Sequence, residues 1–308
     1  LTGTPKTSGF SKVSLLLLKI ERPPNTPITE IRTSNSNIFF ISGNFTVKYA
    51  HLQMFTNITN IIYGPNLSFD SVALSERTKH VHKIHAYKGK FIPQLAEAIL
   101  RKNFKKGDLI LDPFAGSGTT LVQAQELGIN SIGIDIAEFN CLLSRAKTNT
   151  YKTRLLTQDA QKLLSALHSQ SKTGRPLDEI KPLKSSGNKY LKAWYMPTVL
   201  KQLTILRTEL SKIKNKQNKE LLTIIVSRAA KSALATPHAD ITTLKKPVRK
   251  SYYCTKHKKT CKPVTDIKSK FKSYLIDTLS RVEEYEKIKT SAFTKVVIGD
   301  IKTLHLNK

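Results

Sequence analysis

The sequence is short of acidic residues, of cysteine and of long apolar runs. Its 308 residues hold 22 Asp and Glu against 51 Lys and Arg, so the formal net charge is +29. Three cysteines are too few for a disulfide framework, and we expect a reducing, cytoplasmic setting. No run approaches the roughly 20 apolar residues of a membrane span, and Val13–Leu18 is at the short end for a signal peptide. These absences leave a globular protein without a membrane partner.

The positive charge is concentrated in the second half of the chain. Residues 151–308 contain 34 Lys and Arg against 12 Asp and Glu. A surface that binds a polyanion gathers charge in one region, whereas a lysine-rich genome spreads it through the chain. The distribution favours nucleic acid as a partner, and biased composition is the alternative.

Apolar spacing predicts an α/β arrangement in the first half. A strand, a glycine-rich turn, a helix, a strand and a helix follow one another, which is the order of a parallel sheet. The expected elements are a helix over 92–104, a strand over 109–111, a helix over 119–127, a strand over 131–136 and a helix over 139–148.

The rest of the chain departs from that order. Residues 1–35 are expected to be irregular or partly ordered, and 37–49 to form strands joined at 42–44. A linker is expected over 172–189, helices over 198–213, 219–235 and 267–289, and a strand over 295–300. The sequence thus predicts four parts: an irregular or β segment (1–75), an α/β core (76–150), a helical, basic insertion (151–290) and a strand returning to the core (291–308).

The motif Leu109–Thr120 suits a nucleotide-type ligand at the carboxyl edge of a parallel sheet. Gly116 and Gly118 allow a ligand to approach the backbone, and the following helix directs its N-terminal amides to the same place. Asp135 comes 19 residues after Gly116, where an acid meets ribose hydroxyls in dinucleotide folds. A P-loop is excluded because Gly118 is followed by Thr119, and a NAD site because its third small residue is Leu121.

The segment Asp112-Pro-Phe-Ala-Gly-Ser-Gly-Thr-Thr120 resembles the cofactor motif of DNA amino-methyltransferases that use S-adenosylmethionine. His85–Pro93 resembles the segment that folds over the methionine end of the cofactor in this family. Asp135 matches the acid that holds the ribose, and Asp300 is similar to the acid near the adenine. The resemblance implies a Rossmann-like methyltransferase sheet, incomplete here, with a mostly helical basic insertion. The cofactor-binding residues it implies are Lys90, Phe91, Asp112, Pro113, Phe114, Ala115, Gly116, Ser117, Gly118, Thr119, Asp135 and Asp300.

The family transfers a methyl group to the exocyclic amine of cytosine (N4) or adenine (N6), as in restriction-modification, and the resemblance slightly favours cytosine. Its order of motifs makes residues 151–290 the target-recognition region for double-stranded DNA. One alternative is an RNA base methyltransferase, because that class has a similar glycine-rich motif. Another is a non-catalytic DNA-binding or specificity subunit with a vestigial cofactor pocket.

The family's catalytic tetrapeptide (Asp, Asn or Ser, then Pro-Pro and an aromatic residue) is not found where the family order places it. The only Pro-Pro is Pro23-Pro24, far upstream and followed by Asn25, whereas the tetrapeptide should come shortly after Asp300. We therefore expect either a truncated gene or a second polypeptide that supplies the catalytic half. On this expectation the chain alone binds cofactor and DNA without turnover, and no catalytic residue is named.

Residues 245–263 contain eight basic residues and no acidic one. Such a segment suits phosphate contacts, with Tyr252 or Tyr253 available to stack on bases; a solvated loop is the alternative. The predicted DNA-binding residues are Lys245, Lys246, Arg249, Lys250, Tyr252, Lys256, Lys258 and Lys259.

Two groups of residues have side chains that could bind a metal ion. Cys254, His257 and Cys261 offer three ligands, but structural zinc usually has four, and only the distant His238 or Cys141 could complete the set. We therefore expect no metal, and zinc at Cys254, His257 and Cys261 is the alternative. His80, His82 and His85 lack a nearby carboxylate or Cys partner in the sequence. With His80 and His82 on one face of a strand, the three are interpreted as a basic approach to the cofactor.

Overall fold

A computed structural model describes the chain in several stretches. They comprise residues 18–21, 30–33, 36–40, 46–47, 69, 72–73, 76–87, 89–169, 187–238, 240 and 246–301. Of the predicted linker, 172–186 lies outside these residues, as does Lys245 of the predicted DNA-binding set.

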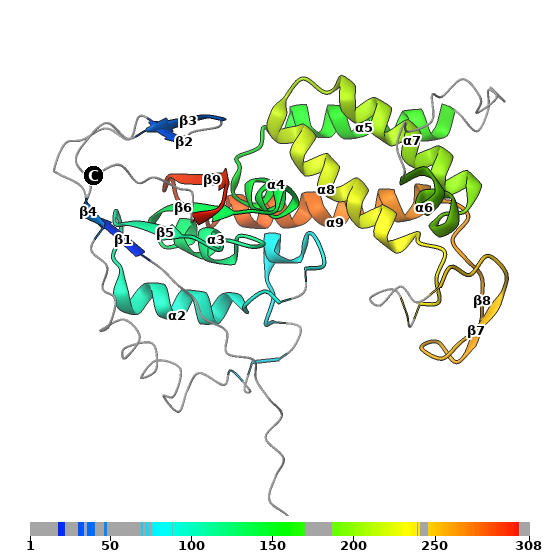
Figure 1. The fold of residues 1–308 in the computed structure, drawn as a ribbon, viewed down its shortest axis with the longest axis horizontal. Helices are drawn as coiled ribbons and strands as arrows, with labels where there is room; N and C mark the ends of the chain where they lie inside the picture. Colours follow the sequence, from blue (N-terminus) through cyan, green and yellow to red (C-terminus); the bar gives the residue numbers. More distant parts are fainter. Residues whose placement is uncertain are drawn as a thin grey trace, which may run out of the picture.

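The central sheet has the strand order β4-β1-β5-β6-β9 (Figure 1). Its strands are β4 (Thr46–Val47), β1 (Leu18–Glu21), β5 (Leu109–Asp112), β6 (Asn130–Asp135) and β9 (Thr294–Ile298). The last three run parallel, and β1 lies antiparallel to β5. Asp112 is paired with Gly133, and Asp135 with Ile298, so all three parallel strands end at one edge. The predicted fold class, with a strand that returns to the sheet late in the chain, is confirmed.

The predicted pairing of the N-terminal strands is wrong. β4 pairs with β1 rather than with the preceding β3 (Ser36–Phe40), which pairs with β2 (Glu30–Thr33). β1 and β2 also lie within the stretch predicted to be irregular or partly ordered. Alternating apolar residues indicate a strand, but the partner is chosen by tertiary packing.

Helices cover the sheet and form the second half of the described chain. They are η1 (His80–Lys83), α2 (Pro93–Asn103), α3 (Thr119–Glu126), α4 (Glu138–Thr148), α5 (Thr153–Ser169), α6 (Gly187–Trp194), α7 (Pro197–Lys212), α8 (Lys216–Ser232) and α9 (Lys268–Glu286). Among these described helices, none is long and apolar enough to cross a membrane.

The sequence predicted α7, α8 and α9 close to their positions and missed α5 and α6. The break between α7 and α8 is shorter than predicted because the Asn215 side chain caps α8, accepting a hydrogen bond of 2.8 Å from the Asn218 amide. A short hairpin of β7 (Tyr252–Cys254) and β8 (Lys259–Cys261) lies at the far end of the helical part from the sheet (Figure 1).

Side-chain alternation along β5 divides the apolar residues between the two faces of the sheet. Ile110 packs with Ile99 and Leu100 of α2, whereas Leu109 and Leu111 pack on the other face in a cluster with residues of β6 and β9. The largest apolar cluster is continuous from η1, α3 and α4 into α5, α7, α8 and α9. The helices that cover the sheet and the helices of the second half are therefore joined by one shared core.

Tyr285 of α9 connects these two parts. Its hydroxyl donates to Gln125 Oε1 (2.8 Å) and lies 3.2 Å from the Val122 carbonyl oxygen, both on α3. Its ring stacks on His80 of η1, with 5.0 Å between the ring centroids. Tyr285 is 1% exposed, so this hydrogen bond to Gln125 is made inside the core.

Replacing this hydroxyl tests how strongly α9 is held. Tyr285→Phe should lower the free energy of unfolding by about 1–3 kcal/mol, because it leaves a buried amide oxygen without its donor. Urea unfolding followed by circular dichroism measures the change. Tyr253→Phe removes the same group from a ring that is 67% exposed and is the matched control. Equal stability of the two variants would contradict the role of Tyr285.

Candidate cofactor site

The turn between β5 and α3 has a backbone that only glycine fits at two places. Gly116 and Gly118 have φ angles of +51° and +75°. A Cβ atom at Gly118 would lie 2.7 Å from Ser144 Oγ, so α4 packs directly on the turn. Glycine is required here by both the left-handed backbone and the close approach of a helix.

Helix α4 holds the carbonyl oxygens of this turn. Ser144 Oγ donates to the Gly116 carbonyl oxygen (3.0 Å), and Lys147 Nζ donates to that of Ser117 (2.6 Å). Asn140 lies one turn earlier on the same helix and donates to Asp135 (3.1 Å). The sequence analysis missed these three residues, although positions 140, 144 and 147 have the spacing of one helix face.

Asp135, at the end of β6, fixes the turn from the other side. Its Oδ2 accepts from the Gly116 amide (2.8 Å), and its Oδ1 from the Ala137 amide (2.8 Å) and the Asn140 side chain (3.1 Å). A carboxylate accepts about four hydrogen bonds, so Oδ2 retains a lone pair. The predicted ribose-binding acid is thus held rigidly beside the glycine turn with acceptor capacity left.

Asp112 is the second acid at this edge of the sheet. Burial raises the pKa of its carboxyl group to about 6, and hydrogen bonds from Thr120 and from the Phe114 amide (3.1 Å) oppose that rise. The negative charge of Asp135 is a further, smaller cause of the rise. Asp112 is therefore a buried carboxyl group that ionises close to neutral pH.

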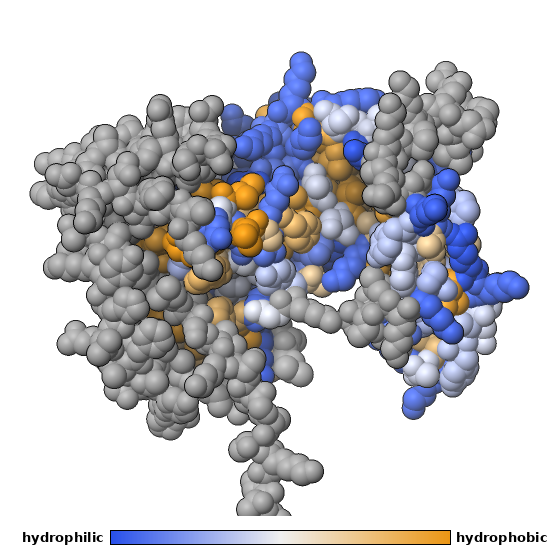
Figure 2. Space-filling model, viewed as in Figure 1, coloured by the Kyte–Doolittle hydropathy of each residue, from blue (hydrophilic) through white to orange (hydrophobic). Residues whose placement is uncertain are grey.

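The turn also carries polar atoms that no group in the described part of the chain satisfies. Ser117 Oγ and Thr119 Oγ1 are buried without a hydrogen-bond partner there. Apolar side chains are exposed around the same edge. Phe114 and Ile136, which follow Asp112 and Asp135 closely, are 65% and 73% exposed, and Phe139 and Ile298 lie nearby. Hydrophobic atoms gather over this part of the molecule in Figure 2. The site combines unsatisfied donors with uncovered apolar surface.

The other predicted cofactor residues lie around this turn in different settings. Pro113 and Ala115 are buried beside it. Lys90 Nζ donates to the His82 carbonyl oxygen (2.7 Å), and Phe91 packs against the α2 cluster. Asp300 follows Gly299, whose amide donates to the Asp135 carbonyl oxygen (3.0 Å). The structure thus brings the strand ends together, and it gives Lys90 and Phe91 contacts within the protein itself.

The interpretation of His80, His82 and His85 as a basic approach is wrong. They lie in or beside the 3-10 helix η1, not on a strand, and are 2%, 0% and 6% exposed. Burial lowers the pKa of His82 well below its usual value, with Lys147 the next cause, and burial lowers that of His85 to about 4. The His82 and His85 imidazoles are therefore neutral at physiological pH, and alternation in the sequence did not distinguish a strand from this turn.

The predicted DNA-binding residues that the structure describes lie on and before the β7–β8 hairpin. Lys246, Lys250, Lys256, Lys258 and Lys259 are exposed. Arg249 is exposed and donates to the Tyr195 carbonyl oxygen (3.3 Å). Tyr252 is half-buried, with its hydroxyl 3.0 Å from His238 Nδ1, so the exposed Tyr253 is the freer ring for stacking.

Residues 34–146 match the model of a family described as DNA methylase. Type II methyltransferase M.MjaII from Methanocaldococcus jannaschii is 36% identical over 79% of this chain and 57% of that protein. The resemblance to DNA amino-methyltransferases is confirmed. The residues outside 151–290 make up less than 79% of the chain, so this match must also include part of the helical, basic region.

Two other relatives match shorter stretches. Type II methyltransferase M.BsoBI from Geobacillus stearothermophilus is 38% identical over 26% of this chain and 16% of its own length. A tRNA (guanine(10)-N2)-dimethyltransferase from Methanocaldococcus jannaschii is 40% identical over 35% of this chain and 30% of its own. The chain spans little more than half of M.MjaII and less of the others. No solved structure shows a significant match.

Lys147 makes the stability of this site depend on pH. Burial, and next the charge of Lys90, lower its pKa from 10.5 to about 7. Above pH 7 the unfolded chain keeps a proton that the folded chain has released, so this residue makes the free energy of unfolding rise with pH until about 10.5.

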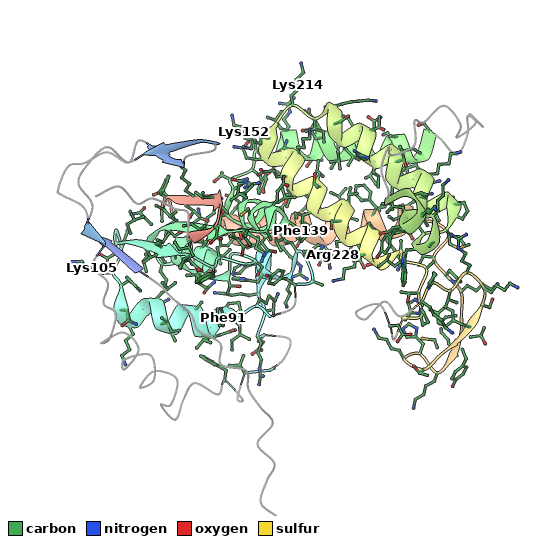
Figure 3. All side chains as sticks on the ribbon, viewed as in Figure 1. Phe91, Lys105, Phe139, Lys152, Lys214 and Arg228 are labelled. Carbon is green, nitrogen blue, oxygen red and sulfur yellow. The ribbon has the colours of Figure 1, made fainter. Side chains whose placement is uncertain are left out.

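Lys147→Met should remove that rise. The difference in unfolding free energy between parent and variant should grow by up to about 1.4 kcal/mol per pH unit between pH 7 and 10. Urea titrations at a series of pH values measure it. Lys152→Met removes an exposed lysine (labelled in Figure 3) and is the matched control. A difference curve for Lys147→Met that stays level across this range would contradict the burial of an uncharged amine.

Proposed function

We propose that this chain is the cofactor-binding and DNA-recognising part of an S-adenosylmethionine-dependent methyltransferase. Its acceptor would be the exocyclic amine of cytosine (N4) or adenine (N6), as the matched family implies. The proposal rests on the glycine turn at the carboxyl edge of the parallel sheet. α4 and the Asp135 carboxylate hold this turn in place by hydrogen bonds, and Asp112 is the second acid at the same edge.

The chemistry of this edge fits S-adenosylmethionine. Asp135 would accept a hydrogen bond from a ribose hydroxyl through its free lone pair, and Ile136 and Phe139 offer apolar surface for the adenine. Asp112 would attract the cationic methionine end, and Asp300 would lie near the adenine, as the resemblance implies. Ser117 and Thr119 have buried hydroxyls that a ligand would satisfy. The bound cofactor supplies a methyl group on a positively charged sulfur, and these residues hold and orient it.

Double-stranded DNA is the partner that the rest of the chain supports best. The exposed basic residues of 246–259 suit phosphate contacts, which position a protein on DNA. In this proposal residues 76–150 with the returning strand 291–308 bind the cofactor, residues 151–290 recognise the target, and the N-terminal segment 1–75 extends the sheet. The tRNA relative supports the RNA alternative, although its match covers less of the chain than that of M.MjaII.

The catalytic residues are not assigned by this proposal. A second polypeptide that supplies them has no support among the relatives. The cytoplasmic setting predicted from the three cysteines, which are all free in the structure, stays a part of the proposal.

Loss of the Asp135 carboxylate should weaken cofactor binding. In calorimetry with S-adenosylmethionine, Asp135→Ala should raise the dissociation constant about 10- to 100-fold, the cost of losing a hydrogen bond to a charged group. Glu138→Ala removes an exposed carboxylate three residues away and is the matched control.

A second measurement separates a ribose contact from damage to the turn. The parent should bind adenosine more tightly than 2′,3′-dideoxyadenosine, and Asp135→Ala should bind both equally. A variant that still prefers adenosine as strongly as the parent does would contradict the proposed contact. Thermal unfolding of both variants shows how far the turn itself is destabilised.

The DNA interface is tested by charge removal at two ends of the helical part. A triple variant of Lys246, Lys250 and Lys256 to alanine should bind a duplex of about 30 base pairs more weakly by at least tenfold. The slope of log affinity against log salt should fall by about 0.9 for each lost phosphate contact. Fluorescence anisotropy across a salt series measures both.

The control triple changes Lys152, Lys214 and Lys216, which are also exposed. Lys152 and Lys214 lie away from the hairpin (Figure 3), and Lys216 follows Lys214 closely, at the start of α8. An equal loss in both triples would indicate that net charge alone attracts DNA. Structured RNA that displaces the duplex at equal concentration would favour the RNA methyltransferase instead.

A further inference from the structure

Four side chains with metal-binding atoms converge at the β7–β8 hairpin. They are His238, Cys254, His257 and Cys261, and one nitrogen or sulfur atom of each lies within 4.8 Å of those of all the others. The sequence analysis saw three of them and treated His238 as distant. The chain between α8 and the hairpin brings His238 back, and its amide donates to the Tyr252 hydroxyl oxygen (3.2 Å).

The register of the hairpin places both cysteines on one face. Tyr252 is paired with Cys261, and Cys254 with Lys259. Directly opposed residues share a face, and residues two apart on one strand also share it, so Cys254 and Cys261 are diagonal neighbours. His257 lies in the connection between the strands, and Lys258 turns the chain there with φ +51°. Two strand positions and one turn position therefore point ligands at one place.

These atoms are about as far apart as neighbouring ligands of a tetrahedral zinc ion. His257 Nδ1 lies 3.5 Å from Cys261 Sγ and 3.7 Å from Cys254 Sγ, and His238 Nδ1 lies 3.8 Å from Cys254 Sγ. With zinc–sulfur bonds of about 2.3 Å and zinc–nitrogen bonds of about 2.0 Å, neighbouring ligands of a tetrahedral site are roughly 3.4–3.8 Å apart. Three of the six pairs of ligand atoms therefore already have the spacing that one ion would impose, and all six lie within 4.8 Å.

We propose that His238, Cys254, His257 and Cys261 form a structural zinc site with two cysteine and two histidine ligands. Thiolate and imidazole ligands select zinc over magnesium or calcium, and four protein ligands leave no open position for chemistry. Both cysteines are free thiols in the structure, as ligation requires. The His238 amide donates to the Tyr252 hydroxyl oxygen (3.2 Å), which holds this residue beside the hairpin.

The local structure gives a reason for a metal here. β7 and β8 have three residues each, and a two-stranded hairpin by itself is only marginally stable in water. Cys254 is the one residue of the two strands that is buried, while residues 255–260, in the turn and the start of β8, are all exposed. With so little apolar burial, four bonds to one ion would hold the hairpin to the chain that carries His238.

A metal at this place would also fix the orientation of the basic residues between the ligands. Lys256, Lys258 and Lys259 are bounded by Cys254 and Cys261. This consequence rests on the proposed DNA binding, whereas the zinc site itself does not. Metal content and DNA affinity are therefore measured separately, so that failure of one proposal is distinguishable from failure of the other.

The test is elemental analysis of the full chain, purified with reductant and without chelator. We expect about one zinc per chain, and less than 0.2 equivalents in His238→Ala, Cys254→Ser and His257→Ala. Cys141→Ser changes the remaining cysteine, which lies at the sheet and donates to the Asp135 carbonyl oxygen, and should keep its zinc. Circular dichroism shows whether each variant is folded.

Cobalt replacement gives a readout that does not depend on the variants. The parent reconstituted with Co²⁺ should show thiolate charge-transfer bands in the near ultraviolet and the visible bands of a tetrahedral ion. Zinc far below one equivalent in folded, reduced parent, together with cobalt that gives no thiolate bands, would overturn the proposal. So would a Cys254–Cys261 disulfide found by mass spectrometry, or iron in place of zinc.

Discussion

Asp135 and α4 hold the glycine turn of the proposed cofactor site from two sides. The turn offers an amide to Asp135 of β6 and two carbonyl oxygens to Ser144 and Lys147 of α4. α4 approaches so closely that no side chain fits at Gly118. Because these bonds satisfy the turn from within the protein, its shape exists before any ligand arrives, and little ordering remains to be done on binding.

The same contact links the sheet to the helical part of the chain. α4 packs on the turn with one face and on α8 with another, where Arg145 forms an ion pair of 2.8 Å with Glu220. Tyr285 of α9 reaches α3 directly behind the turn. The proposed cofactor site and the region proposed to recognise DNA therefore pack on one shared core. Because a close-packed core transmits strain, a packing change at one site should also alter the packing at the other.

The two ends of the molecule differ in what stabilises them. The sheet edge is stabilised by apolar packing and by a dense set of hydrogen bonds. Its burial raises the pKa of Asp112 and lowers that of Lys147. The β7–β8 hairpin has few buried side chains and many lysines. A surface that attracts a polyanion must stay exposed and charged, so it cannot be held by an apolar core, and a metal with four ligands is one physical solution.

The sequence alone determined the α/β core, because apolar periodicity, the motif from Asp112 to Thr120 and the acid at Asp135 are local signals. It also located the basic segment and three of the four clustered ligands. Tertiary structure decided the pairing of β4 with β1, the burial of His80, His82 and His85, the support of the turn by α4, and the approach of His238 to the hairpin. These features join residues far apart in the chain, and local patterns do not record which distant surfaces pack together.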